Sequence, residues 1–146
     1  MIIMKLNEGR LQTAEHILVR TLERKFPDVT FVISEFKEKT GRVEISAKTD
    51  LREGSQTELE DEVNAIINKD LLVKKYILQR RDAEKEFDLA RVPSSVKEVR
   101  IVEIEDFDKT PCKDLHVKRT GEIGRFKILK IEKTGKDRFR FLFTVK

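Results

Sequence analysis

Apolar residues recur every three or four positions in two stretches of the chain, and this spacing predicts two long helices. The first is expected over residues 11–26, with Asn7 placed to cap it and Pro27 to end it. Its apolar side comprises Leu11, Ala14, Leu18, Leu22 and Phe26. The second is expected to begin after Ser55, which has capping-box spacing to Glu58. Its apolar face comprises Leu59, Val63, Ile66 and Ile67.

Other segments alternate apolar and polar residues, or carry short apolar runs, and this predicts strands. We expect strands over residues 30–36, 42–48, 73–78, 97–105, 126–132 and 138–146, and a short helix over residues 81–89. Turn residues at 39–41 and 133–136 predict that the first two and the last two strands form hairpins. The order of elements predicts an α+β fold, a two-layer sandwich with helices packed on a mainly antiparallel sheet.

Composition limits the class of protein. A chain of 146 residues is expected to form one domain over residues 1–146. No apolar run approaches the roughly 20 residues of a membrane span, so no membrane partner is expected. One cysteine cannot form an internal disulfide framework, which favours a cytoplasmic protein.

Charge is distributed unevenly along the chain. After residue 110 there are 11 basic and 4 acidic residues, a net of +7, whereas the first 110 residues carry −3. Such a basic sector is either a contact surface for the phosphates of a nucleic acid or a solvated surface without a partner.

The chain has two histidines and one cysteine, and these carry the candidate chemistry. Cys112 and His116 are separated by three residues, and His16 lies on the first predicted helix one turn after Gln12. Imidazole and thiolate are zinc ligands, and three such ligands with an open position are typical of a catalytic site. The alternative is coincidence, with packed histidines and a small buried cysteine.

The residues around these positions resemble the editing domain of alanyl-tRNA synthetases. Residues 9–18 are similar to its opening motif, His-Thr-Ala-x-His followed by apolar residues. Residues 99–106 and 112–117 are similar to the second half of that domain, and residues 120–124 match its Thr-Gly-Glu-Ile-Gly signature. An apolar-basic strand follows at residues 126–129. The length leaves no room for an aminoacylation domain, so the chain is identified as a short, freestanding AlaX-type member of this family.

The resemblance implies an activity and a metal site. The family hydrolyses the ester of mischarged tRNA for alanine, chiefly with serine attached and in some members glycine, and its fold is an α+β sandwich. His16, Cys112 and His116 align with its zinc ligands. Gln12 replaces the family's first histidine and is a poorer zinc ligand that cannot act as a general base. Gln12 is therefore expected to be a weak fourth ligand or to contact water or substrate.

The resemblance also implies substrate contacts. Thr13 matches the threonine that distinguishes a seryl from an alanyl group, although its hydroxyl could instead bond its own helix. Thr120 and Gly121 are expected to lie near the substrate. The candidate contacts with tRNA phosphates are Arg119, Arg125, Lys127 and Lys130.

Two other functions remain open from the sequence. Because Gln12 removes one expected ligand, the chain could be a non-catalytic tRNA-binding module that kept the editing fold. It could also be a small structural or partner protein, against which the basic C-terminal third argues weakly. The preferred interpretation is a zinc-dependent aminoacyl-tRNA deacylase.

Overall fold

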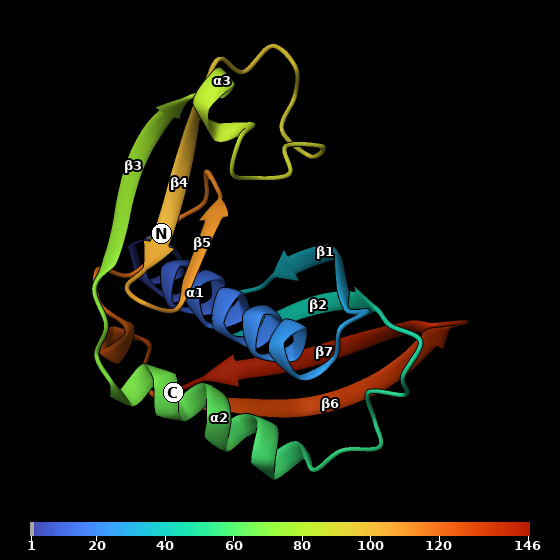
Figure 1. The fold of residues 1–146 in the computed structure, drawn as a ribbon. Helices are drawn as coiled ribbons and strands as arrows, with labels where there is room; N and C mark the ends of the chain where they lie inside the picture. Colours follow the sequence, from blue (N-terminus) through green and yellow to red (C-terminus); the bar gives the residue numbers. More distant parts are fainter. Residues whose placement is uncertain (1) are drawn as a thin grey trace.

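In the computed structural model, the described residues 2–146 form three α-helices and two antiparallel sheets, and side chains are described from residue 7 onward (Figure 1). The predicted α+β class is confirmed. The strands are divided between a sheet of four and a sheet of three, whereas the sequence pattern predicted one sheet layer.

The bounds of α2 and of the six predicted strands follow the sequence pattern closely. The helices are α1 (Ile2–Lys25), α2 (Gln56–Asn68), α3 (Arg80–Ala83) and the 3-10 helix η1 (Thr120–Ile123). The four-stranded sheet contains, in spatial order, β1 (Thr30–Phe36), β2 (Thr40–Ser46), β7 (Arg138–Val145) and β6 (Phe126–Gly135). The three-stranded sheet contains β3 (Val73–Gln79), β4 (Glu98–Ile104) and β5 (Asp108–Pro111).

The main core lies between the four-stranded sheet and the two long helices. Helix α1 packs against β1, β2 and β7, and α2 packs beside it against β6 (Figure 1). Strand β7 contributes an aromatic face, because Phe139, Phe141 and Phe143 are all buried in this core. Ser55 caps α2 as predicted, since its hydroxyl accepts the Glu58 N–H at 3.1 Å. No helix in the described part of the chain is long and apolar enough to cross a membrane.

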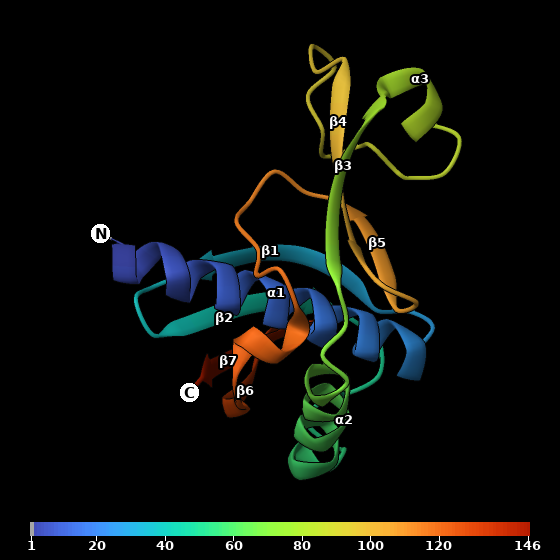
Figure 2. The same ribbon diagram turned by 90° about the vertical axis from the view of Figure 1, so that its left-hand side faces the viewer.

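Strand β4 joins the second sheet to the main core. Val102 and Ile104 point into the main core, whereas Val99 and Ile101 point into a smaller cluster on the other face. Figure 2 shows the three-stranded sheet rising from the side of α1 and carrying α3 away from the larger sheet. This placement brings the start of the loop after β5 beside α1.

Two local predictions about helix ends were wrong. Helix α1 begins at Ile2, so Asn7 lies within it rather than capping it. The Asn7 side chain instead donates to the Glu38 carbonyl at 3.1 Å and accepts from Arg10. The helix expected over residues 81–89 ends at Ala83.

Turns follow α3 directly. The Lys85 N–H donates at 3.2 Å to the carbonyl of Asp82, three residues earlier, which is a turn rather than an α-helical bond. Further along, the Asp88 carboxylate accepts the Ala90 N–H at 2.9 Å and forms another turn. The Arg80 guanidinium donates to the carbonyls of Pro93 and Val96, which fixes the following loop. The sequence pattern also missed β5 and η1, which are four residues each and too short to show a period.

Gly41 is required by the register of the four-stranded sheet. It pairs with Phe143 across β2 and β7, and a Cβ at this position would lie 2.4 Å from the Phe143 ring. Phe143 is fully buried, so its ring has no space into which it could move. The predicted turn between β1 and β2 thus ends at a position that only glycine can occupy without repacking of the core around Phe143.

We expect Gly41→Ala to lower the free energy of unfolding by about 2 kcal/mol, because the added methyl overpacks the core. Gly54→Ala is the matched control, since a Cβ there meets no atom within 4 Å. That variant should be neutral or stabilised by about 0.5 kcal/mol through the unfolded state. Urea unfolding of the two variants measures both values, and equal values would contradict this account of Gly41.

Candidate metal centre

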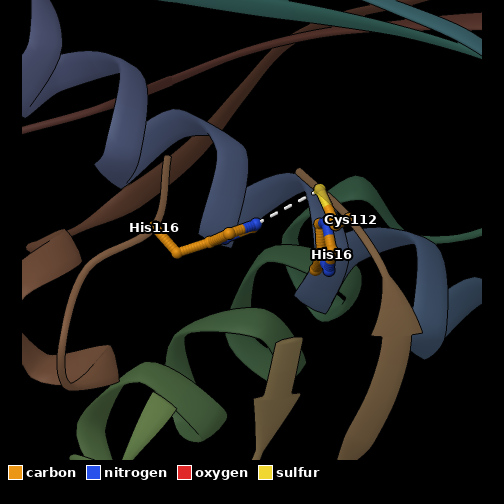
Figure 3. Close-up of side chains that lie close together, drawn as sticks. All are labelled: His16, Cys112 and His116. Carbon is orange, nitrogen blue, oxygen red and sulfur yellow. Dashed lines mark hydrogen bonds between the residues drawn. The ribbon is translucent and has the colours of Figure 1, made fainter. Parts of the chain in front are cut away.

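Three separate parts of the chain bring His16, Cys112 and His116 together. His16 comes from α1, Cys112 follows the last residue of β5, and His116 lies in the loop before η1 (Figure 3). Their ligand atoms all lie within 4.8 Å of one another, and His116 Nε2 is 3.4 Å from Cys112 Sγ. The two imidazole rings meet edge to face, with centroids 4.5 Å apart.

Backbone bonds to β4 fix Cys112. The Cys112 N–H donates to the Arg100 carbonyl at 3.0 Å, which extends the pairing of β4 with β5 by one residue. The Arg100 guanidinium donates to the carbonyls of Lys113 and Asp114 at 2.9 and 3.1 Å. The sheet therefore sets the position of the thiol, and the loop turns towards α1 immediately after it.

The loop that carries His116 is held between α1 and β3. Lys75 on β3 donates to the His116 carbonyl at 3.3 Å, and Val73 N–H donates to the Lys118 carbonyl at 2.8 Å. On the other side Gly9 of α1 comes close, so that a Cβ there would lie 3.5 Å from the His116 carbonyl carbon. These contacts hold His116 near the helix.

The Thr13 hydroxyl fixes the orientation of the His116 ring. Thr13 is fully buried, and its Oγ1 lies 2.8 Å from the Gly9 carbonyl and 3.0 Å from His116 Nδ1. It also accepts the Val117 N–H at 3.1 Å. A hydroxyl has one hydrogen. All three contacts are satisfied only if Thr13 donates to Gly9 and His116 Nδ1 donates to Thr13. His116 Nε2 then presents its lone pair towards Cys112.

Burial keeps the donor groups uncharged. Desolvation lowers the pKa of His116 to about 2, with further lowering by the nearby His16, and it also lowers the pKa of His16. Desolvation raises the pKa of the Cys112 thiol to about 11, and that of the Glu15 carboxyl to about 8. Both imidazoles are therefore neutral at pH 7, the form that binds a metal, whereas the thiol and the carboxyl would release protons to a cation.

The donor set fits zinc. With Zn–N of about 2.0 Å and Zn–S of about 2.3 Å, neighbouring ligand atoms in a tetrahedral site lie about 3.5 Å apart. The 3.4 Å between His116 Nε2 and Cys112 Sγ agrees with this spacing. Gln12 is buried on the same helix, one turn before His16 and on the same face.

The predicted substrate residues Thr120 and Gly121 lie at the end of α2. The Thr120 hydroxyl is buried, accepts the Leu71 N–H at 2.8 Å and lies 3.2 Å from the Ile67 carbonyl. The Gly121 N–H donates to the Asp70 carboxylate at 3.1 Å. These contacts position η1 against α2, and the substrate roles of both residues stay predictions.

The four predicted phosphate contacts fall into two pairs. Arg119 bonds the Asp70 carboxylate at 3.0 Å, and Lys130 lies 3.4 Å from Glu132. Arg125 and Lys127 have no ion-pair partner within residues 7–146, and both line a pocket beside the C-terminus of β7. The second pair is thus the better placed to meet a phosphate.

Two acidic residues at the site were missed from the sequence. Glu15 is 5% exposed, beside His16 on α1, and Asp114 Oδ2 lies 3.6 Å from Cys112 Sγ. The sequence offered one signal for Glu15, which is its position inside the motif of residues 9–18. Consecutive helix residues do not share a face, so this signal did not place Glu15 beside His16. The tertiary fold, and not the helix by itself, buries Glu15.

Thr13→Val should weaken zinc binding about tenfold, because His116 loses the bond that sets its ring. Thr21→Val is the matched control, since the Thr21 hydroxyl likewise bonds the carbonyl four residues earlier, Ile17, at 2.7 Å. The control and Thr13→Ser should both keep nearly the original affinity. Competition with a chromophoric chelator measures each value, and equal losses in the two valine variants would remove Thr13 from the site.

Comparisons with known proteins find similarity to tRNA editing proteins. Residues 99–141 match the family described as the threonyl and alanyl tRNA synthetase second additional domain. The alanyl-tRNA editing protein AlaX-M of Saccharolobus solfataricus is 36% identical over 145 residues, covering 94% of this chain and 58% of that protein. AlaX-L of Pyrococcus horikoshii is 33% identical over 136 residues, covering 92% of this chain and 33% of that protein.

The similarity extends to a synthetase. The alanine–tRNA ligase of Methanopyrus kandleri is 30% identical over 138 residues, covering 90% of this chain and 15% of the ligase. The chain therefore spans less than two thirds of each of these relatives. The resemblance predicted from the motifs is confirmed: over most of its length this chain is a relative of the alanyl-tRNA editing proteins, and it contains a match to the second additional domain of threonyl- and alanyl-tRNA synthetases.

Proposed function

We propose that this chain hydrolyses the aminoacyl ester of mischarged tRNA for alanine, chiefly with serine attached and also with glycine. Residues 1–146 would act as one editing domain, in the cytoplasm, with Zn²⁺ at His16, Cys112 and His116. The observation that carries the proposal is the convergence of these three side chains within 4.8 Å in a chain similar to editing proteins.

The chemistry follows from the donor set. A zinc ion held by the two neutral imidazoles and the thiolate would supply positive charge that polarises an ester carbonyl and activates water. The leaving group is a ribose hydroxyl of the terminal adenosine, and an aminoacyl ester is already reactive. Correct positioning with modest acid–base help is therefore enough for a useful rate.

The protein's own residues prepare the site for this role. Thr13 holds the proton on His116 Nδ1 and leaves Nε2 unprotonated. Arg100 fixes Cys112 and the two residues that follow it. The two imidazole rings are buried, whereas Cys112 is half-buried and Asp114 is exposed, so these two residues mark the side open to a substrate.

We expect fast hydrolysis of seryl-tRNA and slower hydrolysis of glycyl-tRNA for alanine, with alanyl-tRNA spared. His16→Ala and Cys112→Ser should lower the single-turnover rate about a hundredfold or more, because each removes a metal ligand. A chelator should have the same effect on the unmodified protein, and added zinc should reverse it. Thr21→Val serves as the control on α1.

The opposite result also has a clear meaning. If zinc-loaded protein leaves every ester intact but binds tRNA, the proposed activity is wrong. The non-catalytic tRNA-binding module would then be the better description.

The basic residues give a separate prediction about tRNA binding. Replacing Arg125 and Lys127 by alanine should weaken binding. It should also lower the slope of log affinity against log salt by about one for each phosphate that the protein no longer neutralises. Replacing Arg119 and Lys130 removes the same charge, but these two are already paired with acidic residues. Filter binding at several salt concentrations compares the two double variants, and equal weakening in both would contradict a specific role of Arg125 and Lys127 in binding phosphate.

A further inference from the structure

Two exposed apolar side chains belong to the elements that surround the candidate metal centre. Within residues 7–146 the exposed large apolar residues are Ile33, Ile77, Leu115 and Leu129. Ile77 lies on β3, and Leu115 lies in the loop that follows β5, directly before His116. Single exposed apolar residues are common, but two beside one site mark a candidate contact surface.

The register of the three-stranded sheet places Ile77 on the same face as Cys112. Ile77 pairs with Arg100 on β4, and Arg100 in turn lies opposite Cys112, whose N–H donates to the Arg100 carbonyl. Residues directly opposite one another share a face of a sheet, and neighbouring strands lie about 4.8 Å apart. Because Ile77 is two strands away from Cys112, the two residues are about 10 Å apart.

Leu115 belongs to the same surface. The Arg100 guanidinium donates at 3.1 Å to the carbonyl of Asp114, the residue directly before Leu115. Figure 2 shows strand β3 and the loop that leads to η1 side by side above α1. Ile77 and Leu115 therefore lie on the two elements that flank Arg100.

Lysine side chains lie next to this apolar pair. Lys75 is two residues before Ile77, on the same face of β3, and donates to the His116 carbonyl at 3.3 Å. It forms no ion pair within residues 7–146. Lys74, on the opposite face of the strand, is paired with Glu105 at 3.7 Å. The face of β3 beside the donor cluster thus carries the lysine whose charge is not balanced.

The loop of residues 112–118 adds to this positive charge. It contributes Lys113 and Lys118, both exposed, against one acidic residue, Asp114. Neither lysine forms an ion pair in the described part of the chain, and neither does Arg100. A surface with apolar side chains and unbalanced positive charge is suited to a ligand with flat apolar groups and phosphates.

We propose that Ile77 and Leu115 hold the terminal base of an unpaired RNA end, and that Lys75 neutralises the phosphate before it. The inference rests on the proposed function, which takes such an end as its substrate. Isoleucine and leucine side chains pack against the faces of bases, and lysines neutralise phosphates. A nucleoside whose aminoacyl ester lies at the donor cluster extends over about the 10 Å that separates Cys112 from Ile77.

This surface favours an RNA end over a protein partner. A stable protein interface buries about 800 Å² on each partner, which two apolar side chains do not supply. An unpaired RNA end needs less area, because each splayed base makes its own contact and each phosphate adds electrostatic attraction. The surface also lies beside the donors, so it leaves the open position of the metal free.

The test measures the binding of two uncharged tRNAs for alanine, one intact and one whose terminal nucleotide lacks its base. The double variant is Ile77→Ala with Leu115→Ala. The matched control is Ile33→Ala with Leu129→Ala, because Ile33 and Ile77 are 59% and 60% exposed, and Leu129 and Leu115 are both 44% exposed. The two double variants therefore remove the same side chains from equally exposed positions.

We expect the double variant to bind the intact tRNA about tenfold more weakly than the unmodified protein does, because the terminal base loses its apolar contacts. It should bind the base-free tRNA as tightly as the unmodified protein does, since that RNA has no base to lose. The control variant should stay within about twofold of the unmodified protein on both RNAs. Filter binding at one salt concentration gives all of these affinities.

Lys75 is tested by the salt dependence of binding. Lys75→Ala should lower the slope of log affinity against log salt by about one, because one phosphate is no longer neutralised. Lys74→Ala removes the same charge from the opposite face of β3 and should leave the slope unchanged. Equal slopes for the two variants would contradict the role of Lys75.

The outcomes are distinguishable from failure of the proposed function. If loss of the terminal base leaves the affinity of the unmodified protein unchanged, or if the double variant weakens binding of both RNAs equally, the assignment is overturned whatever the rate of ester hydrolysis. It is also overturned if the double variant changes self-association in sedimentation but not tRNA binding, since the apolar pair would then contact a second copy. Base-dependent binding by a protein that leaves the esters intact would support the assignment and overturn the proposed activity alone.

Discussion

The contact between α1 and the loop of residues 112–118 is the constraint on which the candidate site depends. One hydroxyl, that of Thr13, joins the helix carbonyl of Gly9, the His116 ring and the Val117 N–H. The helix and the loop pack closely here, since a Cβ at Gly9 would be in van der Waals contact with the His116 backbone at 3.5 Å. His16 and His116 are 100 residues apart in the chain. This contact holds the loop of His116 against the helix that carries His16.

The division into two sheets also supports the contact between α1 and the loop of residues 112–118. Strand β4 contributes one face to the main core and the other to the small cluster beneath α3. Its pairing with β5 places Cys112 directly after a short strand, with its thiol close to His16 of α1. A single continuous sheet would have given a similar core, but it would have left the thiol without a rigid support beside the helix.

Electrostatics make the site unusual for a protein in which 40% of residues are charged. Many of these charges form ion pairs near the surface, such as Lys25 with Glu62 and Arg42 with Glu35, where each pair contributes little to stability. At the centre the balance is different, because two imidazoles, a thiol and a carboxyl are buried together without a basic partner in the described part of the chain. Such a group of donors is stable in the folded chain when uncharged, and a divalent cation bound there would take the place of the released protons.

The amino-acid sequence by itself determined the fold class, the long elements and the three metal-ligand candidates. Periodicity was sufficient to predict α2, β7 and both hairpins, because long amphipathic elements carry their own signal. The chain has only two histidines and one cysteine, and this made His16, Cys112 and His116 the candidate ligands. Only the tertiary structure decided that Asn7 lies within α1, that α3 is a single turn, that Thr13 orients His116 and that Glu15 is buried beside them. The physical reason is that these features depend on contacts between segments far apart in the chain, or on one competing hydrogen bond, and neither leaves a periodic pattern along it.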